Sequence, residues 1–342
     1  MKEICIGKNE SGKRLDSFLN GYLSGATPGF LYKMLRKKNI TLNDRKADGK
    51  ERLVKGDVVR IYFADETLSK FINPKFKNAL NVDFSDFNKI GDDYALAYKK
   101  IENRGNIEIL FENDDLIVLN KPAGILSQKS KSDDLSINDW LIGYLINSCK
   151  ITPEQLMTYR PAVVNRLDRN TSGVMLCACS LLSARVLSKA LREHQIRKFY
   201  RCVVYGKYNA DAVLRGFMTK DSSKNVNVFR TKNSGSERAK YSETKVELLD
   251  YNNALDVSLL EIELVTGRSH QIRSSLCAAG FPILGDLKYF GDKNNKELLK
   301  KYNISHQLLH AVRIEFPEDF EDGGMGVSGR YFEAPDMFPP LF

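Results

Sequence analysis

One aspartate stands between two arginines in the run Asn165-Arg166-Leu167-Asp168-Arg169, which is followed by the turn-forming residues Asn170–Gly173. Neighbouring cations keep a carboxylate ionised at neutral pH, because an opposite charge within a few Å favours the charged form. An ionised Asp168 could attack a carbon atom or take a proton. The same run is also typical of a solvated surface, where charge pairs contribute little. Residues elsewhere in the chain must distinguish these interpretations.

The composition is typical of a soluble globular protein. The chain has 342 residues, enough for two domains and a sizeable core, with 42% hydrophobic and 28% charged residues. No apolar run approaches the roughly 20 residues that span a bilayer, and the first residues lack the apolar core of a signal peptide. The six cysteines are scattered without a Cys-x-x-Cys pair. We therefore expect a cytoplasmic protein with free thiols and no membrane partner.

Positive charge is concentrated at the N-terminal end. Residues 1–63 hold fourteen Lys or Arg against seven Asp or Glu, whereas the whole chain has a net charge of +9. A small basic unit indicates a polyanionic partner, because contacts from Lys and Arg to phosphates give sequence-independent affinity. The alternative is that this charge only keeps the protein soluble.

The basic unit is predicted to contain two helices and a small β-unit. Leu15, Phe18, Leu19 and Tyr22 recur at helical spacing in residues 13–23. Thr27-Pro28 then provides an N-cap and a proline at the first helical position of a second helix that reaches about Lys38. Short strands are expected over residues 40–44 and 58–63. The basic residues expected to contact RNA are Lys33, Arg36, Lys37, Lys38, Arg45 and Lys46.

About residues 10–63 resemble the S4 RNA-binding domain. The matching pieces are Arg14-Leu15-Asp16, the basic second helix, Ile40-x-Leu42-Asn43 and Gly56-Asp57-x-Val59-x-Ile61. We therefore expect an S4-like RNA-binding domain over residues 1–63. Residues 64–107 have no clear period, and we expect a linker or insert of unknown role there. Its apolar residues, Phe71, Phe76, Leu80, Phe84 and Phe87, are too many for a fully disordered tether.

The remainder, residues 108–342, is predicted to be an α+β domain with a mixed, mainly antiparallel sheet flanked by helices. Strands are expected over residues 107–112, 116–120, 174–178, 198–206, 245–249 and 255–264, and helices over 136–148, 180–195 and 268–279. Gly280 follows the last helix at the position that favours a left-handed glycine. Glycine-rich nucleotide loops are missing from the sequence.

Five segments in order resemble the RluA-type family of pseudouridine synthases, in the branch with an N-terminal S4 domain. They are Asn165–Gly173, Lys198-Phe199-Tyr200, Thr266–Arg273, Gly280–Tyr289 and Leu309-His310-Ala311. The resemblance covers about residues 107–316 in addition to the S4-like unit. It implies the pseudouridine synthase fold. It also implies a reaction in which the base of a uridine in RNA is detached at N1, rotated and rejoined through C5. It also implies that neither a cofactor nor a metal ion is needed.

The resemblance implies a catalytic set of three residues. Asp168 matches the catalytic aspartate, which either attacks the ribose C1′ or removes a proton from the sugar; the sequence leaves both open. Arg273 matches the basic residue that pairs with it, since a partly buried carboxylate is costly unless paired. Tyr200 matches the tyrosine that stacks on uracil and reaches the sugar. The alternatives are a helix-surface arginine and a half-buried strand tyrosine.

Three further residues are assigned to base flipping or RNA contact. Arg166 is expected to fill the space of the extruded base, because a planar guanidinium stacks and hydrogen-bonds at once; a phosphate contact is the alternative. Arg268 and His270 are expected to contact RNA or orient their loop. His270 is not expected to bind a metal ion, because the sequence has no second ligand at a suitable spacing from it. The family usually has His where this chain has Asn165, which could affect loop docking or target choice.

Two other functions remain open at this point. A non-catalytic RNA-binding ribosome-assembly factor could have the same fold, and a hydrolase could combine Asp168 with His270. The second lacks a nucleophile elbow or another carboxylate at defined spacing. Because the S4-bearing branch mostly modifies large-subunit ribosomal RNA, we expect 23S ribosomal RNA rather than transfer RNA as the substrate. We also expect a monomer.

Overall fold

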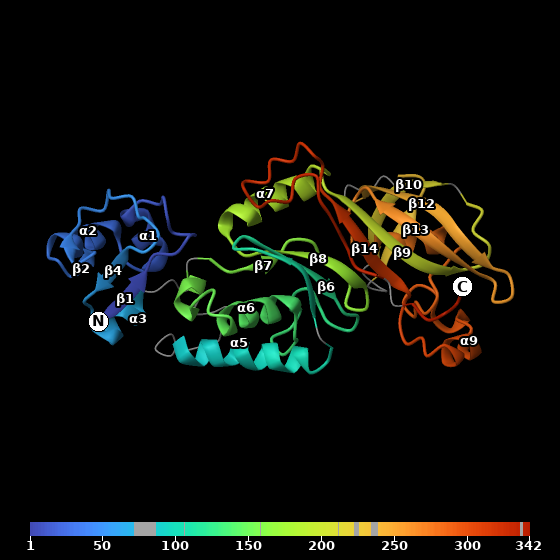
Figure 1. The fold of residues 1–342 in the computed structure, drawn as a ribbon, viewed down its shortest axis with the longest axis horizontal. Helices are drawn as coiled ribbons and strands as arrows, with labels where there is room; N and C mark the ends of the chain where they lie inside the picture. Colours follow the sequence, from blue (N-terminus) through green and yellow to red (C-terminus); the bar gives the residue numbers. More distant parts are fainter. Residues whose placement is uncertain are drawn as a thin grey trace. The chain divides into compact units, whose positions relative to one another are not determined.

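The computed structural model describes the chain except for residues 72–86, 106, 158, 211, 222–225, 234–238 and 336–337. The chain forms two compact units, each made of several segments. Figure 1 labels helices and strands along the chain. The first unit is Met1–Arg104, Asn138–Ala162 and Ala178–Ala184; the second is Gly105–Ile137, Val163–Cys177 and Arg185–Phe342. The predicted division into residues 1–63, 64–107 and 108–342 stays a prediction. Within the described residues, no helix has the length and apolarity needed to cross a membrane.

The first unit begins with a four-stranded sheet in the order β1-β4-β2-β3, in which the neighbouring strands are antiparallel. Its strands are β1 (Lys2–Cys5), β2 (Ile40–Leu42), β3 (Arg45–Lys46) and β4 (Val58–Ile61). Two predicted helices are confirmed as α1 (Leu15–Tyr22) and α2 (Pro28–Arg36). The Thr27 hydroxyl accepts a hydrogen bond from Phe30 N over 3.3 Å, which caps α2. The apolar faces of both helices are buried in one core.

The predicted linker contains helices α3 (Asp65–Phe71) and α5 (Phe87–Glu102). The helix α5 was not predicted, although Tyr94, Ala97, Tyr98 and Ile101 recur at helical spacing. The helix α6 (Ile137–Asn147) packs against it so closely that a Cβ on Gly143 would lie 2.4 Å from Tyr94 O. The predicted packing of Phe76, Leu80 and Phe84 lies outside the described residues.

The second unit is built on a large sheet whose strands run in the order β11-β10-β12-β13-β9-β14-β8-β6-β5, with β15 beside β14 and β7 beside β8. Most of its pairs are antiparallel, whereas β14 and β8 are parallel, as expected for a mixed sheet. The strands are β5 (Glu108–Glu112), β6 (Leu116–Lys121), β7 (Ala162–Val163), β8 (Ser172–Ala178), β9 (Arg197–Tyr205), β10 (Val213–Asp221), β11 (Val226–Arg230), β12 (Lys240–Asn252), β13 (Val257–Leu264), β14 (Leu309–Glu315) and β15 (Tyr331–Glu333).

Helices flank this sheet. They are α7 (Leu181–Arg192), α8 (Gln271–Ala278) and α9 (Lys296–Lys301), with the short 3₁₀ turn η2 (Gly291–Lys293). A further 3₁₀ turn, η1 (Pro153–Met157), belongs to the first unit. The helix α8 lies against β11 and β12 and starts three residues later than predicted. Gly280 follows it with φ +91°, which confirms the predicted left-handed glycine.

A close approach of two strands fixes the residues that follow Asp168. In the parallel pair β8 and β14, Gly173 lies opposite Ala311, and its φ is +114°. A Cβ at Gly173 would lie 2.2 Å from Ala311 O, so only glycine fits there. Beside it, His310 is a buried core histidine, with Nε2 donating to Ala334 O over 2.9 Å and Nδ1 2.8 Å from Ser172 Oγ.

Candidate active site

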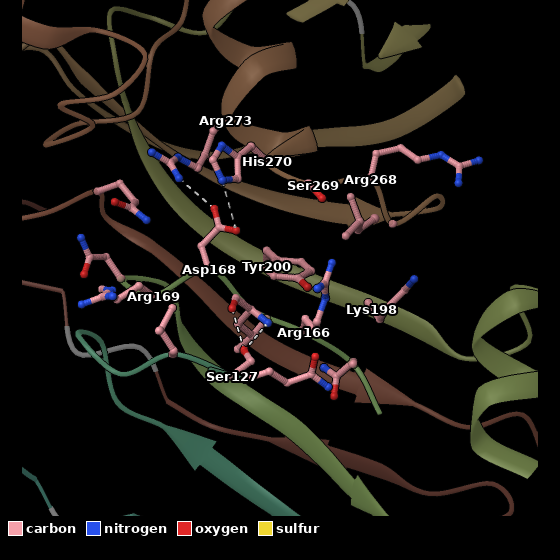
Figure 2. A pocket seen from close by; sticks show the side chains of 18 of the residues that line it. Ser127, Arg166, Asp168, Arg169, Lys198, Tyr200, Arg268, Ser269, His270 and Arg273 are labelled. Carbon is pink, nitrogen blue, oxygen red and sulfur yellow. Dashed lines mark hydrogen bonds and ion pairs between the residues drawn. The ribbon is translucent and has the colours of Figure 1, made fainter. Parts of the chain in front are cut away.

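The second unit contains a cavity of about 1090 Å³ at which the predicted active-site residues meet. Six of them line it: Arg166, Asp168, Tyr200, Arg268, His270 and Arg273 (Figure 2). They come from the turn before β8, from β9, and from the start of α8 and the loop before it. The six basic residues predicted to contact RNA belong to the first unit, where all are exposed.

Ser127 holds the turn that carries Asp168. Its Oγ donates to Leu167 O over 2.7 Å and accepts from Leu167 N over 3.0 Å. Both residues are buried, so neither main-chain group has water as an alternative partner. Ser127 was not among the predicted site residues, because no motif surrounds it in the sequence.

Lys121, at the end of β6, holds the other side of this turn. Its Nζ donates to Pro122 O and Ile125 O over 2.8 Å and to Arg169 O over 3.0 Å, which uses all three N–H groups of an ammonium. Burial lowers the pKa of Lys121 to about 7, whereas the Asp168 charge favours the protonated form. The sequence signal was a lysine placed directly after an apolar strand, in Lys-Pro-Ala-Gly.

Arg273 bridges two carboxylates. Its Nη1 donates to Asp168 Oδ2 over 2.8 Å, while Nε and Nη2 donate to the two oxygens of Asp286 over 2.7 and 2.8 Å. The side chain of Asp168 is 27% exposed, but those of Arg273 and Asp286 are only 7% and 1% exposed. Burial opposes the charge of Arg273, but the hydrogen bonds and charges of Asp286 and Asp168 outweigh it and raise its pKa.

His270 lies on the other side of the same carboxylate (Figure 2). Its Nε2 is 3.8 Å from Asp168 Oδ1, and its Nδ1 is 3.0 Å from the hydroxyl of Tyr289. Burial lowers the pKa of His270 below its usual 6.5, the cations Arg273 and Lys288 lower it further, and Asp168 opposes both. His270 is therefore neutral at pH 7. It precedes α8 in the left-handed conformation, with φ 55°.

Tyr200 extends from β9 beside Asp168 (Figure 2). It is 7% exposed. Burial and the negative charge of Asp168 both raise its pKa, so its phenol keeps its proton at neutral pH. Lys198, two residues before it, also lines the cavity, and burial lowers its pKa. Lys198 belongs to the segment Lys198-Phe199-Tyr200, in which only Tyr200 was predicted to have a role.

The arginines of the site differ in how firmly they are held. Arg166 is exposed and forms no ion pair or hydrogen bond within the described part of the chain. Arg268 is also exposed, but its Nε donates to Tyr241 O over 3.1 Å. Arg169 points to Asp134, with Nη2 and Oδ1 3.6 Å apart. Of these three arginines, Arg166 is thus the one with the greatest freedom to meet a ligand.

Asn165 is tied to the backbone of β8. Its Oδ1 accepts from Leu176 N over 2.7 Å, and its Nδ2 donates to Val174 O over 3.3 Å. An amide supplies the acceptor and donor that this arrangement needs. Asn165 stands where the family usually has His, and its side chain joins the segment before Asp168 to β8. Among the described residues, no three His, Cys, Asp or Glu are grouped to hold a metal ion.

Comparison with known proteins extends the likeness over almost the whole chain. A sequence model described as RNA pseudouridylate synthase matches residues 115–278. The ribosomal large subunit pseudouridine synthase C of Haemophilus influenzae is 31% identical, over 94% of this chain and 89% of the relative. An uncharacterised RNA pseudouridine synthase of Mycoplasma genitalium is 28% identical, over 92% and 89%.

Solved structures share the fold. The human RNA pseudouridylate synthase domain containing 4 has a TM-score of 0.53 and 24% identity, over 73% of this chain and 94% of its own. The human RNA pseudouridylate synthase domain containing 1 has a TM-score of 0.52 and 22% identity, over 68% and 84%. The sequence likeness and the shared fold lead to one conclusion: the chain belongs to the RluA-type family of RNA pseudouridine synthases and is an isomerase that acts on RNA.

Proposed function

We propose that this enzyme converts specific uridines of 23S ribosomal RNA to pseudouridine, with Asp168 as the group that reacts at the ribose. The observation that carries the proposal is the position of Asp168. It lies in a cavity of about 1090 Å³, paired with Arg273 and still 27% exposed, so a substrate can reach it. The name of the Haemophilus influenzae relative, a ribosomal large subunit pseudouridine synthase, supports large-subunit ribosomal RNA as the substrate.

In this proposal the target nucleotide leaves the RNA stack before it reacts. An enzyme that breaks the N1–C1′ bond and forms a C5–C1′ bond must reach C1′ and C5 and let the base rotate, which a stacked nucleotide does not allow; extrusion costs a few kcal/mol. The free guanidinium of Arg166 takes the place of the extruded base. Arg268 and His270 contact the RNA or order their loop, where His270 is 20% exposed at the side chain.

Tyr200 and Arg273 then serve the reaction centre. The ring of Tyr200 stacks on the uracil, and its protonated phenol can donate a proton but cannot accept one at neutral pH. Arg273 keeps Asp168 oriented. Asp168 attacks C1′ and displaces N1, or it removes a ribose proton and the N1–C1′ bond breaks to leave a glycal. In either course the detached base rotates and C5 bonds to C1′, while the Asp168–C1′ bond breaks or the ribose proton returns. The C5 proton is then lost and N1 gains a proton, so the product is an isomer of the substrate. Both courses remain open.

The N-terminal residues supply RNA affinity in this proposal. Residues 1–63 form an S4-like domain in which Lys33, Arg36, Lys37, Lys38, Arg45 and Lys46 contact phosphates, and all six are exposed. The enzyme works as a monomer in the cytoplasm. The cysteines, Cys5, Cys149, Cys177, Cys179, Cys202 and Cys277, are free, which supports a reducing compartment.

The test follows the C5 hydrogen. Transcripts of 23S ribosomal RNA and of transfer RNA, labelled with tritium at uridine C5, are incubated with wild type, Asp168→Asn and Asp114→Asn. The control replaces an exposed aspartate of the same unit. We expect tritium release from 23S RNA only, and a loss of about 10³-fold or more in kcat for Asp168→Asn with RNA affinity retained.

Three results would contradict this proposal. Wild type that binds RNA but leaves its uridines unchanged would support the RNA-binding alternative. Release from transfer RNA alone would show that the substrate is wrong. Activity in Asp168→Asn equal to that of the control would show that another residue reacts.

A further inference from the structure

We propose that the turn Gly285–Tyr289 positions both groups that face Asp168: Asp286 directs Arg273 toward one carboxylate oxygen, and Tyr289 sets which nitrogen of His270 presents its hydrogen to the other. Asp286 and Tyr289 are positioning residues, because neither contacts Asp168 in the described hydrogen bonds and ion pairs. The inference rests on the proposed reaction at Asp168.

The Asp286 carboxylate is itself fixed in direction. Its Oδ1 accepts from the turn amides Lys288 N over 2.9 Å and Tyr289 N over 3.1 Å, and both oxygens accept from Arg273. A guanidinium is planar with a rigid fork of donors. Once Nε and Nη2 lie on Asp286, Nη1 has one direction left, and that direction leads to Asp168 Oδ2 at 2.8 Å.

The turn can hold this arrangement because its backbone is anchored. Gly285 has φ +81°, and a Cβ there would lie 2.3 Å from His306 O, so glycine is required. The buried side chain of Asn294 accepts from Gly285 N over 3.1 Å and donates to Asp286 O over 3.3 Å. The Asp286 side chain therefore starts from a backbone with little freedom to move.

Tyr289 contacts both Arg273 and His270. The guanidinium of Arg273 lies 5.1 Å from the centre of the Tyr289 ring, within the range of a cation–π contact. The Tyr289 hydroxyl accepts from the main-chain N–H of Asn227 over 3.2 Å and lies 3.0 Å from His270 Nδ1. Because an amide N–H can only donate, it occupies an acceptor site of the phenol oxygen, and we infer that the phenol O–H donates to His270 Nδ1.

If the Tyr289 hydroxyl donates to Nδ1, the tautomer of His270 follows. A neutral imidazole that accepts at Nδ1 carries its hydrogen on Nε2, and Nε2 faces Asp168 Oδ1 at 3.8 Å. The other tautomer would turn a lone pair toward the carboxylate. The two oxygens of Asp168 therefore differ: Oδ2 is held by Arg273, and Oδ1, which accepts no hydrogen bond from the described residues, is the oxygen left to react.

The test uses Asp286→Asn and Tyr289→Phe in the full-length enzyme, with Tyr331→Phe as the control at an exposed tyrosine of the same unit. Single-turnover rates at saturating RNA separate kcat from RNA affinity. We expect kcat to fall by about 10²-fold for Asp286→Asn and about 10-fold for Tyr289→Phe, since misplacement of a reacting group by about 1 Å can cost 10²-fold. We expect the RNA affinity of both variants to match that of wild type, and the control Tyr331→Phe to match wild type in both kcat and RNA affinity.

A spectroscopic measurement separates positioning from general support of the fold. The chain has four histidines, so nitrogen-15 NMR of their side chains can follow His270, assigned with a His270→Gln variant. We expect hydrogen on Nε2 in wild type and a mixture of tautomers in Tyr289→Phe. A structural role alone would leave the tautomer unchanged.

The two hypotheses fail in different ways. If Asp168→Asn keeps its activity, the proposed function is wrong. If Asp168→Asn is inactive while Tyr289→Phe has wild-type kcat and an unchanged His270 tautomer, only the positioning inference is overturned. Should Asp286→Asn fail to fold, the result for Tyr289→Phe decides alone, because this variant keeps the ring against Arg273.

Discussion

The hydroxyl of Ser127 forms two hydrogen bonds with the main chain of Leu167: its Oγ donates to Leu167 O over 2.7 Å and accepts from Leu167 N over 3.0 Å. The two residues are 40 positions apart in the sequence, so one hydroxyl joins the segment after β6 to the turn before β8. Asp168 is the next residue along the chain. Its position therefore depends on a bond that involves no charge and no sequence motif.

Replacing Ser127 should loosen this turn. In Ser127→Ala, both main-chain groups of Leu167 lose a partner in a buried place, which costs about 1–3 kcal/mol in the free energy of unfolding. We expect kcat to fall about 10-fold as Asp168 becomes less well oriented, with RNA affinity unchanged. Urea unfolding and single-turnover rates measure the two effects. Ser132→Ala, which removes an exposed hydroxyl bonded to Asp133, is the control; equal kcat in both variants would contradict the role of Ser127.

Gly173→Ala should be strongly destabilising. The new Cβ would lie 2.2 Å from Ala311 O, in a backbone with φ +114°, so β8 and β14 would have to separate at their parallel pair. We expect a loss of more than about 2 kcal/mol in the free energy of unfolding. The matched control is Gly267→Ala, where the new Cβ would meet only Lys198 Nζ, at 3.9 Å. Thermal and urea unfolding of the two variants should differ clearly, and equal stabilities would refute the close approach.

Tyr200 should make the protein less stable at alkaline pH. Its pKa is raised above the usual 10.0 by burial and by Asp168. Above about pH 10 the unfolded chain loses this phenol proton while the folded protein keeps it, so stability falls as the pH rises. Tyr200→Phe removes this loss, and its free energy of unfolding should decline less between about pH 9 and pH 11 than that of wild type.

The control for this measurement is Tyr331→Phe, which removes a tyrosine that is 63% exposed and should keep the pH dependence of wild type. Urea unfolding at each pH gives the free energies. Identical alkaline slopes for wild type and Tyr200→Phe would mean that the phenol titrates in the folded protein as it does in the unfolded chain.

Sequence patterns predicted the elements that are marked by nearby residues, such as a helix cap or a run of apolar side chains. The cap and proline of α2 and the apolar run of β6 required no tertiary information. The meeting of Asp168 with Arg273, 105 residues away, came from the family resemblance, since no local pattern encodes it. Their roles in the reaction remain proposals.

Other features depend on tertiary contacts and could not be predicted. The central glycine of β10, Gly216, interrupts the strand pattern, and it is needed because a Cβ there would lie 2.4 Å from Arg230 O. The N-terminal strand β1 has four residues of which only Ile4 is buried, too few to show a period. Asp286 was quoted within a motif, but its pairing with Arg273 follows from the packing of the turn against α8.

Removing basic residues of α2 and its C-terminal end should weaken RNA binding in a salt-dependent way. Lys33, Arg36 and Lys37 are exposed, and each phosphate contact releases counterions, so the slope of log Kd against log salt should fall by about 0.7–0.9 per residue replaced by Gln. The triple variant should keep the kcat of wild type at saturating RNA, because these residues do not line the cavity around Asp168. Lys99→Gln with Lys100→Gln, on exposed positions of α5 in the same unit, is the control. A triple variant with the salt slope of wild type would show that α2 does not contact RNA.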